Sequence, residues 1–181
     1  MDRPAPRKRA PRPLDAPRLE ELALAYVARF AVTRAKLEAY LQRKLRERGW
    51  DGEAAPDPAG LAARFVDLGY VDDAAWARMK SGSLMRRGLG QRRVGQALAA
   101  AGVAEDIRAD LRPSMAEGRE AALLLARRRR FGPFGASLPD RPLRERQLAA
   151  MLRAGHPLDS ARELVNAPSI AAAEAWARME D

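Results

Sequence analysis

The chain has 181 residues and a mass of 19.9 kDa, a size that suits one domain or a short array of repeats and excludes a large multidomain protein. Lysine and arginine total 33 against 24 acidic residues, a net charge of +9, so the expected partner is nucleic acid or a protein that binds it. The absence of cysteine excludes disulfides, thiolate zinc sites, iron–sulfur clusters and cysteine nucleophiles, and the single histidine, His156, excludes a multi-histidine metal site.

The sequence also lacks the features of a membrane or exported protein. It contains no apolar run of about 18 residues, and its N-terminus is charged and rich in proline. We therefore expect a cytoplasmic protein with no membrane, metal or cofactor. Arginine supplies 29 of the 33 cations, and its planar guanidinium group forms paired hydrogen bonds with phosphate or carboxylate.

Residues 1–18 are predicted to form a disordered basic arm. They hold five of the 13 prolines and six cations against two acids, which gives the segment a charge of +4. Proline blocks helix formation, and the segment has too few apolar residues to organise its charge.

Residues 19–68 show apolar positions at helical spacing. Two helices are expected, separated by a cap at Thr33, with the second ending at Gly49. A third helix begins at Asp57-Pro58, a cap followed by a first-turn proline. Its predicted core positions are Leu61, Phe65 and Leu68.

Residues 69–112 predict three more helices. Asp72 caps the first, which carries Trp76 and Met79 on one face, and Gly88 and Gly90 end it. The next helix runs to Gly102 and a short one follows. Their apolar positions are Val94, Leu98, Ile107 and Leu111.

Residues 113–181 begin with a capping box, Ser114-x-x-Glu117, that opens a helix ending at Arg127–Arg130. A loop follows over residues 131–139. Further helices are predicted from about Pro142 to Gly155, through Leu158, Ala161 and Leu164, and from Ser169 to the end.

These segments do not show the alternation of apolar and polar residues that is typical of strands, so the predicted fold is all-α. Three helices share one ending, in which an apolar residue lies four positions before a glycine: Leu45 and Gly49, Leu98 and Gly102, Met151 and Gly155. Such units bury their apolar faces by stacking. We therefore expect an elongated tandem array of three three-helix repeats over residues 19–68, 69–112 and 113–166, with an insertion at 131–139 and a C-terminal helix at 167–181.

Three motifs that resemble catalytic or phosphate-binding sites are better explained by structure. Gly88-Leu89-Gly90 lacks the third glycine of a dinucleotide fingerprint and the lysine of a P-loop, which favours a helix-breaking turn. Asp72-Asp73 is typical of a helix start. His156 precedes a proline and is expected in a turn or on the surface. No catalytic residue is predicted, so the chain is not expected to be an enzyme.

The strongest chemical signal is a run of cations with no acidic residue between them: Lys80, Arg86, Arg87, Arg92 and Arg93. It predicts a surface that faces a polyanion, and the adjacent glycines are expected to let the backbone approach a partner closely. Arg43 and Lys44 belong to a weaker, mixed patch near Glu38 and Glu47. Arg127–Arg130 can be explained in part by the dipole of its helix. Trp50, Trp76 and Trp176 are interpreted as core residues.

The segment from Gly69 to Val103 resembles the central signature of the RecX family of bacterial recombination regulators. The resemblance rests on Gly69-Tyr70-Val71-Asp72-Asp73-Ala74-Ala75-Trp76, then Arg86-Arg87-Gly88-x-Gly90-x-Arg92-Arg93-Val94, Leu98 and Gly102-Val103. Family members are tandem arrays of three-helix repeats, in agreement with the repeat above. In this signature Gly69, Tyr70, Asp72, Asp73 and Trp76 correspond to positions that define the fold.

The resemblance implies a non-enzymatic regulator that binds the filament of the RecA recombinase on DNA and restrains its ATPase and strand exchange. The implied partners are RecA and single-stranded DNA, with double-stranded DNA as a further candidate, and the chain is expected to be a monomer. The cationic run from Lys80 to Arg93 is the expected contact. Two alternatives stay open: a helix-turn-helix-like, sequence-specific DNA-binding protein and a purely protein-binding helical solenoid.

Overall fold

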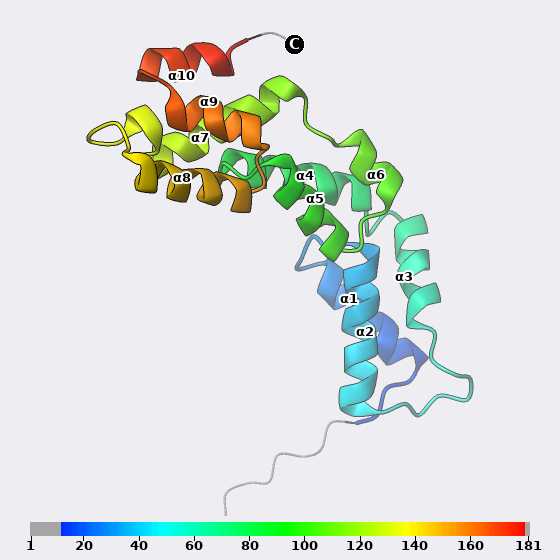
Figure 1. Cartoon of the computed structure of the whole chain (residues 1–181). Coiled ribbons are helices and arrows are strands. Elements are labelled where there is room, and N and C mark those ends of the chain that lie inside the picture. Colours follow the sequence, from blue (N-terminus) through cyan, green and yellow to red (C-terminus); the bar gives the residue numbers. More distant parts are fainter. Residues whose placement is uncertain (1–11, 180–181) are drawn as a thin grey trace, which may run out of the picture. The chain divides into compact units, whose positions relative to one another are not determined.

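The computed structural model describes residues 12–179 (Figure 1). Within this part the chain forms α-helices, one short 3₁₀ helix and no named β-strand. The prediction of an all-α fold is therefore confirmed. None of the helices in residues 12–179 is both long and apolar enough to cross a membrane.

The chain divides into two compact units, one ending at Asp72 and one beginning at Asp73. The first unit contains helices α1 (Ala16–Val27), α2 (Arg34–Arg48) and α3 (Pro58–Asp67). Helix α2 contacts both of the others. The side chains buried between them include Leu14, Leu19, Leu37, Leu41 and Phe65.

The prediction of a disordered basic arm is wrong for residues 12–18. Residues 1–11 lie outside the described part of the chain. Leu14 is fully buried, and its backbone exchanges hydrogen bonds of 3.0 and 2.8 Å with Gly49 and Asp51. Asp15 caps α1 by accepting a hydrogen bond from the Arg18 backbone. Pro17 fits in the first helical turn, where no backbone donor is needed. One apolar side chain and one cap therefore order a segment whose composition indicated disorder.

The second unit has two hydrophobic cores, each enclosed by its own set of helices. Helices α4 (Asp73–Arg86), α5 (Gln91–Ala100) and α6 (Glu105–Asp110) enclose the first, which includes Trp76, Leu84, Val94 and Leu98. Helices α7 (Met115–Arg129), α8 (Arg141–Arg153), α9 (Leu158–Asn166) and α10 (Ile170–Ala177) enclose the second, which includes Met151 and Leu164. Helix α9 contacts α7, α8 and α10, and α4 contacts α7.

The predicted insertion at 131–139 is packed on the second of these cores. Residues Gly132–Phe134 form the 3₁₀ helix η1, and the Gly132 backbone N–H donates to the buried side chain of Gln147 at 2.8 Å. Phe131 and Phe134 pack against the core. This loop is therefore held to α8 by a buried polar contact and to the core by two aromatic rings.

The helix starts predicted at Thr33, Asp57 and Ser114 are confirmed. Thr33 and Asp57 accept the expected backbone hydrogen bonds, and Ser114 with Glu117 forms a reciprocal capping box. One predicted core position is wrong: Leu68 is 60% exposed and follows the last residue of α3. Met79, predicted on one face with Trp76, is 53% exposed, because the buried face of α4 consists of Trp76, Ala77, Ser81 and Leu84.

The glycines at the three predicted repeat ends, Gly49, Gly102 and Gly155, all have positive φ. Two of these ends share a further feature. The residue after Gly102 and the residue after Gly155 each donate back to a carbonyl five positions earlier, at 3.1 and 3.2 Å, which is the closing bond of a Schellman motif. The repeat boundaries themselves stay a prediction.

Candidate nucleic-acid interface

The turn between α4 and α5 packs against the turn between α8 and α9 through bare backbone. The Gly90 N–H donates to the Ala154 carbonyl at 2.9 Å, and the Arg92 N–H donates to the Gly155 carbonyl at 3.3 Å. A Cβ atom added to Gly90 would lie 2.5 Å from the Gly155 backbone. The glycines expected to let a partner approach thus serve contacts within the chain: Gly90 lets the two turns approach each other, and a Cβ atom on Gly88 would lie 2.9 Å from the Leu125 backbone nitrogen in α7.

His156 lies at the centre of this contact. Its ring is 4% exposed, and Nε2 lies 3.0 Å from the Gly88 carbonyl oxygen, to which it donates as the neutral tautomer. Burial lowers the pKa of His156, while the hydrogen bond to Gly88 acts in the opposite direction. This histidine occupies a turn, as predicted, and is buried instead of lying on the surface.

The packing of the two turns creates a pocket of about 530 Å³ lined by arginines from four places in the sequence. We call it the basic pocket, and its charged lining consists of Arg87, Arg93, Arg128, Arg129 and Arg153. No acidic residue is among its lining residues within the described part of the chain. Its apolar walls come from α7, α8 and nearby turns, and include Leu89, Leu125 and Phe131.

All five arginines of the basic pocket are exposed. Arg128 donates to the Arg87 carbonyl at 3.0 Å, and Arg93 donates to Gln96 at 3.3 Å. Neither contact neutralises a positive charge. Guanidinium groups gathered in this way suit the paired acceptors of phosphate and carboxylate groups.

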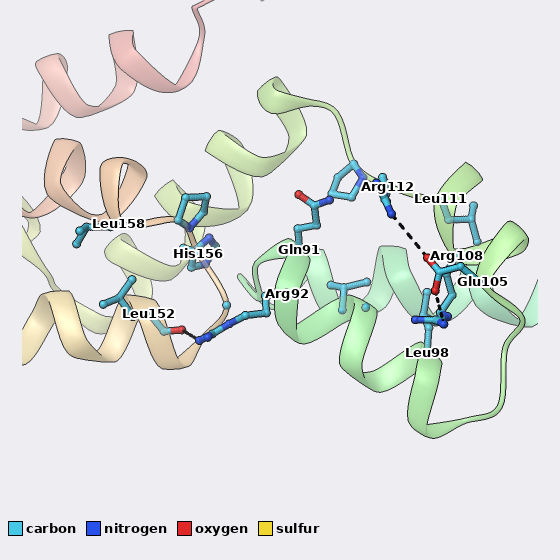
Figure 2. Close-up of a pocket in the computed structure, with 15 residues that line it drawn as sticks. Gln91, Arg92, Leu98, Glu105, Arg108, Leu111, Arg112, Leu152, His156 and Leu158 are labelled. Atoms are coloured by element: carbon cyan, nitrogen blue, oxygen red, sulfur yellow. Dashed lines mark hydrogen bonds and ion pairs between the residues drawn. The ribbon is translucent and has the colours of Figure 1, made fainter.

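The structure places the residues of the predicted cationic run at different sites. Arg87 and Arg93 line the basic pocket, whereas Arg92 turns to the Leu152 carbonyl and lines a different groove (Figure 2). Lys80 and Arg86 lie on α4 and are not among the lining residues of the basic pocket.

The weaker patch lies in the first unit and is partly neutralised. Lys44 and Arg43 lie 2.6 and 3.5 Å from Glu47. The hydrogen bond from Lys44 lowers the pKa of Glu47, so this carboxylate stays ionised beside the two cations. The patch therefore offers less positive charge to a partner than its two cations alone would.

Sequence reasoning missed Arg128, Arg129 and Arg153 as members of the site. The first two belong to a run that helix-dipole complementarity explained in part, and Arg153 is one of four arginines in α8, which also carries Glu145. The glycine turns themselves are the signal in the sequence that could have found Arg153. Arg87 and Arg153 each precede such a turn, and these two turns are in contact.

The signature residues fall at the junction of α3 and α4. Gly69 has a φ of 76°, which favours glycine. Tyr70 lies against Phe65 with 5.4 Å between ring centroids, and Trp76 is buried in the α4–α6 core. Asp73 opens α4. Trp50 and Trp176 are partly buried and pack against the cores of the first and second units.

Comparison with known proteins supports one family. The chain is 33% identical to the regulatory protein RecX of Myxococcus xanthus over 166 residues, covering 86% of this chain and 88% of that protein. It is 28% identical to the regulatory protein RecX of Mycobacterium sp. strain JLS over 90% of both chains.

No protein-family model matches the sequence. The crystal structure of RecX from Lactobacillus salivarius shares the fold, with a TM-score of 0.62 and 18% identity over 81% of this chain and 92% of that chain. The identity and coverage shared with the M. xanthus protein, together with the signature from Gly69 to Val103, establish that the chain belongs to the RecX family of regulatory proteins.

Proposed function

We propose that this protein binds the filament that RecA forms on DNA and inhibits its ATPase and strand-exchange activities, thereby regulating recombination and DNA repair. Membership of the RecX family implies regulation of RecA. The observation that supports a direct contact with the filament is the basic pocket, in which five arginines meet without an acidic neighbour among its lining residues in the described chain.

A nucleoprotein filament offers both of the groups that arginine binds well. DNA supplies phosphate oxygens, and acidic side chains of the recombinase supply carboxylates. Binding of this kind changes the stability of the filament without any chemical step by the regulator.

The proposal is tested by adding the protein to RecA filaments assembled on single-stranded DNA. We expect the rates of ATP hydrolysis and strand exchange to fall as the regulator saturates the filament. Unchanged rates, with binding verified by co-sedimentation, would refute inhibition.

The basic pocket is tested with a charge-reversed variant, Arg93→Glu with Arg153→Glu. We expect this variant to lose filament binding and to retain its helical circular dichroism. The matched control is Arg141→Glu with Arg162→Glu, which makes the same charge change at two exposed arginines outside the pocket. Equal losses in the two variants would show that net charge, instead of the basic pocket, governs binding. Arg92 is left unchanged because its guanidinium bonds to the backbone of α8.

Two further measurements separate this proposal from its alternatives. A sequence-specific DNA-binding protein would distinguish DNA sequences in a competition experiment without RecA. A purely protein-binding solenoid would have negligible affinity for free DNA, with little dependence on salt. We expect little sequence preference and strong salt dependence.

A further inference from the structure

A second concave surface of the same unit, separate from the basic pocket, lies between α5, α6 and the turn before α9 (Figure 2). We call it the α5–α6 groove; its volume is about 590 Å³. Val94 and Leu98, each only 2% exposed, form the floor, and the more accessible Leu111, Leu152 and Leu158 supply the apolar sides. A groove with this lining provides places for apolar side chains of a partner.

The charged lining of the α5–α6 groove is cationic on balance. Arg108 and Arg112 both pair with Glu105, the second at 3.6 Å, and Figure 2 shows these three side chains together at one end of the groove. Arg92 lies toward the other end, where it bonds to the Leu152 carbonyl. The lining thus holds three arginines and one glutamate. An incoming carboxylate can replace exposed Glu105 at little cost, because exposed ion pairs contribute little stability.

Gly95 gives an independent indication that a partner approaches here. It lies in the middle of α5 and lines the groove, and a Cβ atom at this position would meet nothing within 4 Å. Glycine destabilises a helix interior relative to alanine, and no neighbour within the described chain requires it at this position. The missing side chain at Gly95 permits the close approach of another chain at this point of the groove.

We propose that the α5–α6 groove binds a short acidic segment of a partner protein, with apolar side chains on the floor of the groove and carboxylates at Arg108 and Arg112. The apolar lining of the groove disfavours a nucleic acid, because a sugar–phosphate backbone carries no aliphatic side chains to pack there. The chain's own residues 1–18, with a charge of +4, are unsuited as the occupant. This inference goes beyond the proposed function, because it adds a protein-binding site that shares no arginine with the basic pocket.

The test uses the full chain and a fluorescently labelled synthetic peptide in which leucines alternate with pairs of aspartate and glutamate. Fluorescence anisotropy is compared with that of two further peptides, one with lysine in place of the acids and one with serine in place of leucine. We expect the acidic, leucine-containing peptide to bind roughly tenfold or more tightly than either. Equal affinities, or no binding of the first peptide at millimolar protein, would overturn the proposal.

Two variants locate the binding to the α5–α6 groove. Gly95→Leu fills the groove and Arg112→Glu reverses an exposed charge, and each is expected to weaken the peptide complex by roughly tenfold. The matched control for the first is Gly118→Leu, which also adds a side chain to open space on a helix but lies outside the groove. Unchanged affinity in both groove variants would overturn the proposal.

Failure of this inference is distinguishable from failure of the proposed function. The variant Arg93→Glu with Arg153→Glu is expected to bind the peptide as the unmodified protein does, since neither residue lines the groove. Peptide binding is measured without RecA or DNA, so a loss of RecA inhibition alone leaves the result for the groove unaffected.

Discussion

His156 is the only histidine in the chain, and its burial makes the stability of the fold depend on pH. Because burial lowers its pKa in the folded state, the unfolded chain takes up a proton at a higher pH than the folded chain. The stability associated with the neutral ring is present above the unfolded value of about 6.5 and is lost as the pH falls below it.

We therefore expect the free energy of unfolding to decrease from about pH 7 to about pH 5. The variant His156→Gln keeps a donor for the Gly88 carbonyl and does not titrate. The free energy of unfolding of this variant should therefore decrease less between the two pH values than that of the unmodified protein. Urea denaturation of both proteins at the two pH values provides the measurement. Parallel decreases would show that groups other than His156 govern this pH range.

Arg130 is the only residue other than glycine with a positive φ in residues 12–179. It ends α7 in the left-handed conformation with a φ of 56°, a conformation that costs a side-chain-bearing residue roughly 1 kcal/mol. Arg130→Gly should therefore raise the free energy of unfolding by about that amount. Arg130→Ala removes the same charge and keeps the strained φ, so it should give no such gain in thermal or chemical denaturation. An equal gain in both variants would assign the effect to charge.

At the scale of elements, the contact between the α4–α5 turn and the α8–α9 turn determines where the basic pocket forms. Gly90→Ala places a methyl group 2.5 Å from backbone atoms of Gly155, and backbone has little freedom to move in a packed interior. We expect a loss of roughly 2 kcal/mol or more in the free energy of unfolding, together with weaker filament binding, because Arg93 and Arg153 would move apart.

The control for this change is Gly118→Ala on α7, where the added methyl group meets nothing within 4 Å. It should stabilise the protein by about 0.5–1 kcal/mol through helix propensity. Denaturation of the two variants under the same conditions tests the predicted decrease in the free energy of unfolding for Gly90→Ala and the predicted increase for Gly118→Ala. A stable Gly90→Ala variant would contradict the close packing of the two turns.

At the scale of the whole molecule, the charge of +9 predicts binding to DNA that weakens steeply with salt. Each phosphate contact with single-stranded DNA contributes a slope of about −0.7 to the dependence of log affinity on log salt. Arg93→Ala should therefore make the slope shallower by about 0.7, whereas Arg141→Ala, outside the basic pocket, should leave it unchanged. Anisotropy of labelled single-stranded DNA over a series of salt concentrations measures both slopes. An unchanged slope for Arg93→Ala would remove this residue from the DNA contact.

The sequence by itself determined the features that depend on near neighbours in the chain. Helix positions follow from apolar spacing, and helix starts follow from caps such as Thr33, Asp57 and Ser114, each of which bonds to backbone three residues away. The signature from Gly69 to Val103 also indicated the family, because the order and spacing of its residues are properties of the sequence alone.

Only the tertiary structure decided which of these residues act together. Arg87 and Arg153 are far apart in the sequence and meet because two glycine turns pack backbone to backbone. The same contact directs Arg92 to the α5–α6 groove and buries His156. Leu14 is ordered by Gly49 and Asp51, which follow a helix later in the chain. The physical reason is common to all of these cases: burial and charge convergence depend on contacts between distant segments, which local spacing does not encode.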